Sequence, residues 1–168
     1  MATVSLSLDE IYKLANKTLL ANGCDQETAD ILSELITNAE RDGSLSHGLF
    51  RLPAYVSGLK SGKINGKQKP DIKKLTPSVI KADGKNCLAP VVLNKSIPEL
   101  VKAAKENGVA VLAIINSHHM AAMWPETEKI AEEGLVAFAC TSYKPAVAPA
   151  GAINCLLYTS PSPRDRFL

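Results

Sequence analysis

The sequence predicts an α/β (mixed) fold in which a helical N-terminal portion is followed by an α/β layer. The helices are predicted because apolar residues recur at helical spacing over residues 8–19 and again over residues 29–39. The layer is predicted because a helix, a glycine and an apolar run occur in this order twice, with runs at residues 109–115 and 135–141. Continuous apolar runs of this length are typical of strands buried on both faces.

The ends of the first two helices are marked by capping residues. Ser7 and Glu10 have the spacing of a capping box, and Gly23 is placed to end the first helix. Asp25 can cap the second helix, which should end at residues 42–43. The two helices should form a hairpin with a shared apolar face.

A third helix is expected next, with Ser46 as its N-cap and Gly62 at its end. Phe50 and Tyr55 should be buried on it. Pro53 is tolerated only in the first turns of a helix, so the start of this helix should be irregular.

The rest of the chain should build the layer. A polar linker at residues 66–70 precedes a predicted strand at 72–82 and a tight turn at 83–84. A helix at 97–107 leads to the apolar run 109–115, and a second, short helix precedes the run 135–141.

Composition excludes several classes of function. The 168 residues have a net charge of +2 and no dense basic patch, which argues against a nucleic-acid partner. No apolar run approaches the ~20 residues of a membrane span, and the N-terminus lacks the features of a signal peptide. The four cysteines have no CxxC spacing, so a reduced, cytoplasmic protein is expected.

All three histidines lie in two short motifs, Ser46–Arg51 and Asn116–His119. In the first, His47 and Arg51 are four residues apart and would share one face of a helical turn. The arginine fork matches a carboxylate, and a histidine can donate a proton at neutral pH. Gly48 should leave room for a ligand. The alternative interpretation is a surface arginine and a capping histidine.

The second motif follows a predicted strand, at the edge of a sheet where ligands commonly bind. His118 and His119 are adjacent, so their side chains diverge, and no familiar His–Glu spacing accompanies them; no metal site is therefore expected. The glycine fingerprint of Rossmann folds, the P-loop and the Gly-x-Ser-x-Gly elbow are also absent from the sequence. A Rossmann dehydrogenase is therefore not predicted.

Two segments resemble the malate/L-lactate dehydrogenase-like oxidoreductases, a family whose dinucleotide-binding fold is not Rossmann. They are RDGSLSHGLFRLPAYVSGLKSGKIN and GVAVLAIINSHHMAAMWPETEKIAEEGLVAFACTSYKPAVAPAG. The double histidine followed by MAAMWPETE is most similar to the branch of Δ1-piperideine-2-carboxylate and Δ1-pyrroline-2-carboxylate reductases. Met120 stands where that branch commonly has phenylalanine.

The resemblance implies an enzyme that reduces a small cyclic 2-imino acid by hydride transfer from NADPH or NADH. His47 would donate the proton, Ser46 would take part in its relay, and Arg51 would hold the substrate carboxylate. Five further residues would lie along the nicotinamide cofactor: His119, Met120, Ala121, Ala122 and Met123.

The resemblance also implies a division of the chain. Residues 1–65 would be a helical catalytic and dimerisation portion, and residues 66–154 the incomplete first part of a cofactor and substrate domain. Cys155 to Asp165 matches the translation of a transposon adapter used for sequencing libraries, so residues 155–168 are expected to be an artefact. The complete protein would be a homodimer, and the truncated chain would be inactive.

Two alternatives stay open. One is a malate/L-lactate-type 2-hydroxy acid dehydrogenase, which a comparison of imino with oxo acid substrates would separate. The other is a non-catalytic ligand-binding module, which predicts no oxidation of NADPH with any such acid.

Overall fold

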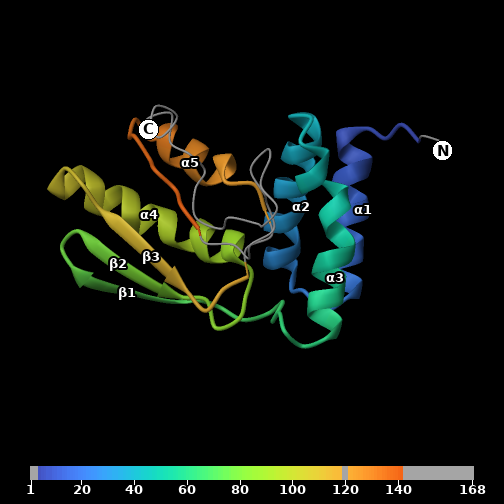
Figure 1. Ribbon diagram of the computed structural model, residues 1–168, viewed down its shortest axis with the longest axis horizontal. Helices are drawn as coiled ribbons and strands as arrows, with labels where there is room; N and C mark the ends of the chain where they lie inside the picture. The colour runs from blue at the N-terminus through green and yellow to red at the C-terminus, as the bar shows by residue number, and fades with distance from the viewer. Residues whose placement is uncertain (1–3, 119–120, 142–168) are drawn as a thin grey trace, which may run out of the picture. The chain divides into compact units, whose positions relative to one another are not determined.

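The computed structural model describes residues 4–118 and 121–141. Residues 1–138 form one compact unit, and a second unit begins at residue 139. The first unit contains, in order, α1 (Leu8–Ala21), α2 (Gln26–Arg41), the 3-10 turns η1 (Leu45–His47) and η2 (Leu49–Arg51), α3 (Leu52–Lys60), β1 (Asp71–Thr76), β2 (Val79–Asp83), α4 (Ala89–Asn107), β3 (Val111–Ile115) and α5 (Trp124–Ala131) (Figure 1). Helices therefore precede a mixed helix-and-strand layer, as predicted.

The predicted caps are present at the first two helices. At α1, the amide of Glu10 donates to the Ser7 hydroxyl at 3.3 Å, and the Glu10 carboxylate accepts from the Ser7 amide at 2.8 Å. At α2, the Asp25 carboxylate accepts from the amide of Thr28 at 2.9 Å. Each cap satisfies a backbone donor that the first turn of a helix leaves unpaired, so both helices start where the sequence predicts.

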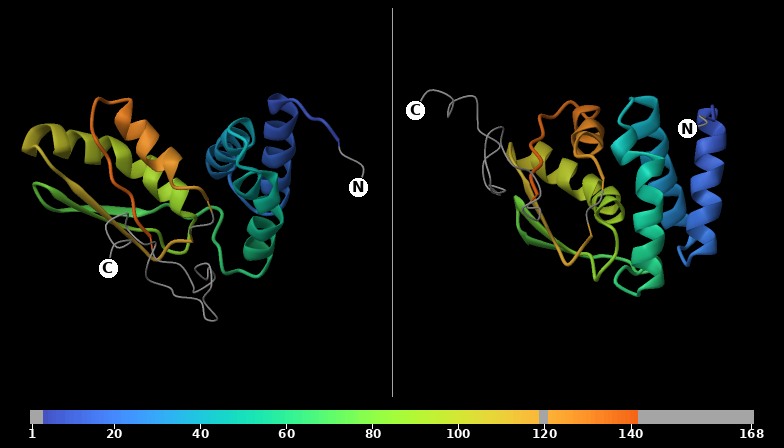
Figure 2. Two further views of the ribbon diagram at one scale, coloured as in Figure 1. Left: turned by 45° about the horizontal axis from the view of Figure 1, so that its top comes forward. Right: turned by 45° about the vertical axis from the view of Figure 1, so that its right-hand side comes forward.

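The main core lies among α1, α2, α3 and the start of α4 (Figures 1 and 2). Its members with the least exposure are Ala15, Leu19, Ala29, Leu32, Ile36, Tyr55, Leu88 and Val91. Leu88 and Val91 come from the beginning of α4, so the helical portion and the layer share one core. The predicted boundary near residue 65 stays a prediction about the complete protein.

Shortening a buried side chain of this core should destabilise the fold. Leu32→Ala should lower the free energy of unfolding by about 2–5 kcal/mol, because the leucine is fully buried and its removal leaves a cavity. Leu14→Ala is the matched control: Leu14 is 47% exposed on α1, and its loss should cost less than about 1 kcal/mol. Chemical denaturation followed by circular dichroism measures both, and equal losses would contradict this core.

The sheet has three strands in the order β1-β2-β3. β1 and β2 are antiparallel, and β2 and β3 are parallel. The single strand predicted over residues 72–82 is wrong, because a turn at Pro77 and Ser78 divides it into β1 and β2. Proline fixes φ near the value that tight turns need, which explains the break.

Only one face of the sheet is covered by a helix in the described part of the chain. Ala82, Leu112 and Ile114 pack with Val92 of α4 on that face. The side chains of β3 alternate between exposed and half-buried, with Val111 55% exposed. The prediction that the run 109–115 forms a strand buried on both faces is therefore wrong. Among the described strands β3 lies at the edge of the sheet, and its side chains alternate in exposure although its sequence is apolar throughout.

The strand predicted over residues 135–141 is also wrong, since these residues form no strand in the structure. Val136 and Phe138 are 102% and 91% exposed. An apolar run forms a strand only where a neighbouring strand supplies hydrogen bonds. None of the described strands pairs with residues 135–141.

The connection from β2 to α4 is shorter than predicted, because α4 begins earlier in the chain. The turn expected at residues 83–84 centres on Lys85 and Asn86, both with positive φ (47° and 67°). The amide of Cys87 closes it by donating to the Gly84 carbonyl at 2.8 Å. α4 then begins at Ala89 instead of residue 97 and continues through Pro98.

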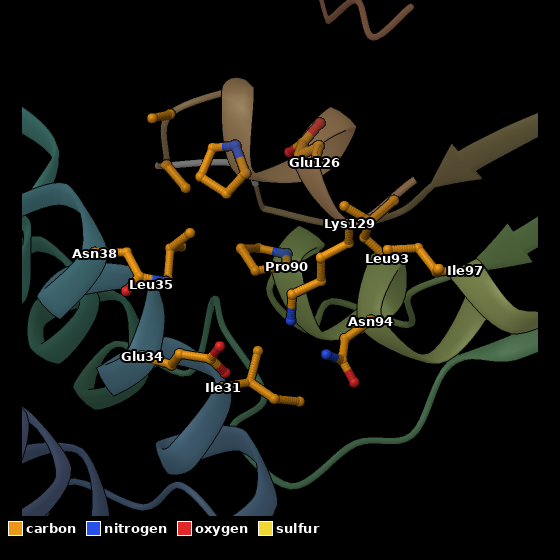
Figure 3. A pocket seen from close by; sticks show the side chains of 13 residues that line it. Ile31, Glu34, Leu35, Asn38, Pro90, Leu93, Asn94, Ile97, Glu126 and Lys129 are labelled. Carbon is orange, nitrogen blue, oxygen red and sulfur yellow. The ribbon is translucent and has the colours of Figure 1, made fainter. Parts of the chain in front are cut away.

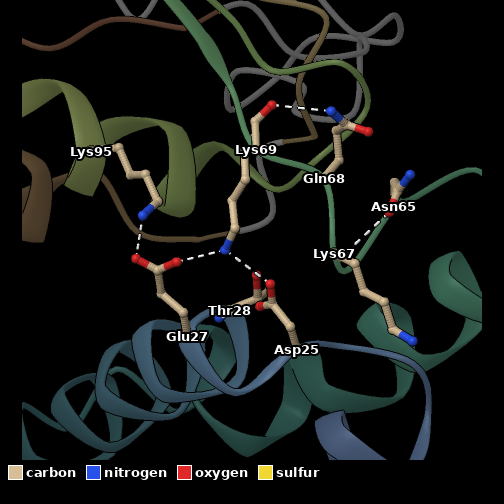
Figure 4. Close-up of polar contacts among 8 residues, drawn as sticks. All are labelled: Asp25, Glu27, Thr28, Asn65, Lys67, Gln68, Lys69 and Lys95. Carbon is tan, nitrogen blue, oxygen red and sulfur yellow. Dashed lines mark hydrogen bonds and ion pairs between the residues drawn. The ribbon is translucent and has the colours of Figure 1, made fainter.

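A cluster of charged side chains joins the start of α2 to the following layer (Figure 4). The Lys69 ammonium lies 2.9 Å from the Asp25 carboxylate and also pairs with Glu27. Lys95 of α4 pairs with the same glutamate. Burial raises the pKa of Asp25, but the hydrogen bonds from Lys69 and Thr28 outweigh it and lower that pKa to about 2.

This pKa predicts a pH dependence of stability. A carboxyl with a folded pKa of about 2 and an unfolded value of about 3.9 stabilises the fold above pH 4, and this contribution is lost as the pH falls towards 2. Asp25→Ala should cost about 0.5–2 kcal/mol at pH 7, and less below pH 3. Asp25→Asn is the control, since asparagine still caps a helix but does not titrate. Denaturation curves at several pH values test this, and a pH-independent loss in the alanine variant would contradict it.

None of the helices within residues 4–118 and 121–141 is both long and apolar enough to span a membrane. The described cysteines, Cys24, Cys87 and Cys140, are free thiols. Burial raises the pKa of Cys24 to about 11, which keeps this thiol protonated at neutral pH.

Candidate functional site

The first histidine motif lies on two short 3-10 turns instead of the single helical turn predicted. His47 ends η1 and Arg51 ends η2, and Gly48 between them has φ −86° and ψ −136°. The prediction that both share one helix face is therefore wrong, as is the assignment of Ser46 as an N-cap, because Ser46 lies inside η1. Phe50, expected to be buried, is 74% exposed.

Two serine hydroxyls surround one ring nitrogen of His47. The Oγ atoms of Ser46 and Ser44 lie 3.0 Å and 3.2 Å from Nδ1. Ser44 was not among the predicted site residues. Its backbone carbonyl accepts from the amide of His47 at 2.8 Å, and this turn brings its side chain back to the ring. A serine three residues before the histidine was the signal available in the sequence.

Glu40, near the end of α2, binds the backbone where η1 joins η2. Its carboxylate accepts from the amide of Leu49 at 2.7 Å. A Cβ placed on Gly48 would lie only 2.1 Å from Oε1 of Glu40. The prediction that Gly48 leaves room for a ligand is therefore wrong, since the Glu40 side chain fills that space.

This arrangement predicts a double-mutant result. Gly48→Ala should displace the Glu40 carboxylate and break its hydrogen bond to Leu49, which costs about 1.5–3 kcal/mol for a charged acceptor. Glu40→Ala should lose a similar amount. Because both changes remove the same hydrogen bond, the double variant should be less destabilised than the sum of the two. Denaturation of the three variants measures this, and strict additivity would contradict the contact.

Arg51 has a polar atom that no described group satisfies. Its Nε is buried and has no hydrogen-bond partner in the described part of the chain. Tyr55, one turn along α3, is fully buried near it: burial raises the pKa of Tyr55 to about 12, and the positive charge of Arg51 acts in the opposite direction. Because a buried donor without a partner is costly, this atom indicates a site for an acceptor such as a carboxylate.

The second histidine motif begins by pairing with the entry to α4. The amide of His118 donates to the Cys87 carbonyl at 3.0 Å, and the His118 carbonyl accepts from Ala89 at 2.9 Å. Of the predicted cofactor residues, Ala121 and Ala122 are buried and Met123 is half-buried. His119 and Met120 lie outside the described residues.

Trp124, five residues after the second motif, contacts the first motif. Its ring lies edge-on to that of His47, with centroids 6.1 Å apart and planes at 78°. Its indole N–H donates to the Asp42 carboxylate at 3.4 Å. The segment that contains Ala121, Ala122 and Met123 therefore ends at a residue in contact with His47.

Ala121 and Ala122 line a groove between α2, α4 and α5 (Figure 3). The other lining residues are Ile31, Glu34, Leu35, Asn38, Pro90, Leu93, Asn94, Ile97, Pro125, Glu126 and Lys129. In Figure 3, Glu34 and Lys129 approach the groove from α2 and α5. Its small apolar surface suits an uncharged ring such as nicotinamide. Lys129 is the one cation among its described lining residues, beside two carboxylates, so the groove does not suit the phosphates of a dinucleotide.

Residues 4–118 and 121–141 contain no cluster of three or more His, Cys, Asp and Glu side chains that could hold a metal ion.

The malate/L-lactate dehydrogenase family model matches residues 6–162 of the chain. The chain is 41% identical to a Δ1-pyrroline-2-carboxylate reductase from Ancylobacter novellus over 94% of its own length and 46% of that relative. It is 39% identical to the crystal structure of Δ1-piperideine-2-carboxylate reductase from Pseudomonas syringae pv. tomato, with a TM-score of 0.75 over 79% of this chain and 40% of that one. A malate dehydrogenase from Entamoeba histolytica is 28% identical, with a TM-score of 0.74 over 79% and 37% of the two chains.

These comparisons confirm the predicted resemblance, including its branch, and they extend past Asn154, where the resemblance was expected to end. The chain spans about half the length of the curated relatives it matches. Residues 155–168 lie outside the described residues, and their origin from an adapter stays a prediction. The chain belongs to the malate/L-lactate dehydrogenase family of oxidoreductases.

Proposed function

We propose that the whole protein reduces the C=N bond of a small cyclic 2-imino acid, with reduced nicotinamide as the hydride source. One observation supports this most: the buried Nε of Arg51, which has no partner among the described residues, four positions after His47. A guanidinium with an unused donor suits a substrate carboxylate. The printed names of the Ancylobacter and Pseudomonas relatives support an imino acid as the substrate class.

His47 is proposed as the proton donor. Its Nδ1 lies among the hydroxyls of Ser44 and Ser46, so Nε2 is the ring nitrogen that we assign to the substrate. A hydroxyl can donate to Nδ1 of the neutral ring and accept from it when the ring is protonated. Either serine can therefore stabilise both protonation states while His47 gives up its proton and regains it.

When bound, a reduced nicotinamide supplies a hydride to the carbon of the C=N bond. The substrate nitrogen takes a proton from His47, and the product is a cyclic amino acid whose carboxylate stays on Arg51. Holding the acid and the proton donor in fixed positions lowers the entropic part of the barrier. Ala121, Ala122 and Met123 are proposed to lie along the nicotinamide, and the cofactor phosphates to lie outside the groove of Figure 3.

Consumption of reduced nicotinamide by the whole protein tests this proposal. NADPH and NADH are each supplied with Δ1-piperideine-2-carboxylate, pyruvate or oxaloacetate. We expect the highest kcat/KM with the imino acid and NADPH. Turnover of the oxo acids alone would favour the malate/L-lactate-type alternative, which the Entamoeba relative makes the second candidate. No turnover would favour the non-catalytic module.

The choice of NADPH, the homodimer and the cytoplasmic location remain predictions. The same holds for the roles of His119 and Met120 as cofactor contacts, since both residues lie outside the described part of the chain.

A further inference from the structure

Trp124, the single tryptophan of the sequence, links the start of α5 to two residues that lie much earlier in the chain. It is the first residue of α5, it contacts the ring of His47, and it donates to Asp42 at the end of α2. Asp42 is itself held by Arg41, whose Nε donates to it at 2.8 Å. The hydrogen bond to Asp42 thus holds the indole N–H, while the indole ring contacts the imidazole of His47.

The serines and the tryptophan constrain different movements of His47. The hydroxyls of Ser44 and Ser46 hold Nδ1, but a ring held at one nitrogen can still tilt. A ring edge-on at 6.1 Å limits that tilt, because aromatic side chains prefer this geometry. Together these contacts fix both the position of Nδ1 and the plane of the ring.

We infer that Trp124 is a positioning residue for His47, and that it couples the orientation of this ring to the adjoining segment 121–123. In the proposed enzyme, one side chain then determines two things. These are the position of Ala121 and Ala122 in the groove and the orientation of the His47 ring. The catalytic meaning of this inference rests on the proposed function, but the contact itself does not.

The fluorescence of Trp124 in the 168-residue chain tests the contact directly. Protonated imidazole quenches a neighbouring indole, so the intensity should change between about pH 5 and 8, where histidine titrates. Among the described residues, the charged groups around this contact include Asp42, which accepts from Trp124, Arg41, which pairs with Asp42, and Glu40, whose carboxylate accepts from the amide of Leu49. Glu128 of α5 acts electrostatically on Arg41. The hydrogen bond from Arg41 lowers the pKa of Asp42, so this carboxylate stays ionised over that range.

Matched variants assign the transition. His47→Gln should abolish it, and His118→Gln should leave it unchanged. A transition that survives in the His47 variant, or its absence from the unmodified chain, would overturn the inference. The titrations need neither cofactor nor substrate. If the fluorescence transition is present but the reductase assay fails, the proposed function is rejected and the inferred contact stands.

Ring resonances of His47 measured by NMR test the positioning role. Trp124→Leu should shift these resonances, because it removes the ring current of the indole, and should allow a second orientation of the His47 ring. Trp124→Phe should leave the resonances close to their positions in the unmodified chain, because phenylalanine also has a ring current. Circular dichroism checks that the variants fold. If the leucine variant does not fold, the phenylalanine variant and the fluorescence titration decide. Unchanged His47 resonances in a folded leucine variant would overturn the inference.

Discussion

Replacing His47 by alanine should lower kcat of the whole protein by about a hundredfold to ten-thousandfold, the usual contribution of a general acid. KM for the imino acid should change little, because the variant keeps Arg51, the proposed partner of the carboxylate. Steady-state kinetics with NADPH in excess measures both parameters. The effect should be on the chemical step, since the proposed role of His47 is to donate a proton to the substrate nitrogen as the hydride is transferred.

Ser46→Ala and Ser44→Ala are the matched controls for that variant. Each removes one of the two hydroxyls at Nδ1 and leaves the other, so each should reduce kcat much less than the loss of the imidazole. The double serine variant should approach His47→Ala. A His47→Ala enzyme with unchanged kcat would remove this residue from the proton-donor role.

Replacing Arg51 by alanine should act mainly on KM for the acid. Loss of a charge-assisted hydrogen bond costs about 1.5–3 kcal/mol, equivalent to a rise in KM of roughly 10- to 150-fold. Arg51→Lys should recover only part of the affinity, because an ammonium cannot form the two parallel hydrogen bonds of a guanidinium. Kinetics over a range of imino acid concentrations separates these effects.

A second measurement distinguishes carboxylate binding from general damage. The KM for NADPH should stay nearly constant in both Arg51 variants, since the proposed contact is with the acid. Equal increases in KM for both substrates, or no change in either, would contradict the assignment of Arg51.

The local signals in the sequence predicted the helical part well. The Ser7 capping box and the Asp25 cap are present, and two glycines placed to end helices, Gly23 and Gly62, have positive φ. These features depend on residues within one turn of each other, which is why the sequence alone was sufficient.

Contacts between distant parts of the chain were not predicted. The helix expected through His47 and Arg51 is interrupted at Gly48, next to the point where the carboxylate of Glu40 accepts from the amide of Leu49, nine residues further along the chain. The exposure of β3 depends on what lies beside the sheet and is not encoded in its apolar run. The contact of Trp124 with His47 joins residues 77 positions apart, and no spacing rule indicates it.

In the proposed reaction, hydride reaches the carbon next to the carboxylate while His47 protonates the nitrogen. The most direct test supplies the whole protein with a cyclic imino acid and with nicotinamide cofactor deuterated at its transferred C4 position, and locates the deuterium in the product by NMR. We expect one deuterium on the ring carbon that bears the carboxylate, and none on that carbon when unlabelled cofactor is used in heavy water. Product without deuterium from the cofactor, or deuterium taken from the solvent at that carbon, would contradict it.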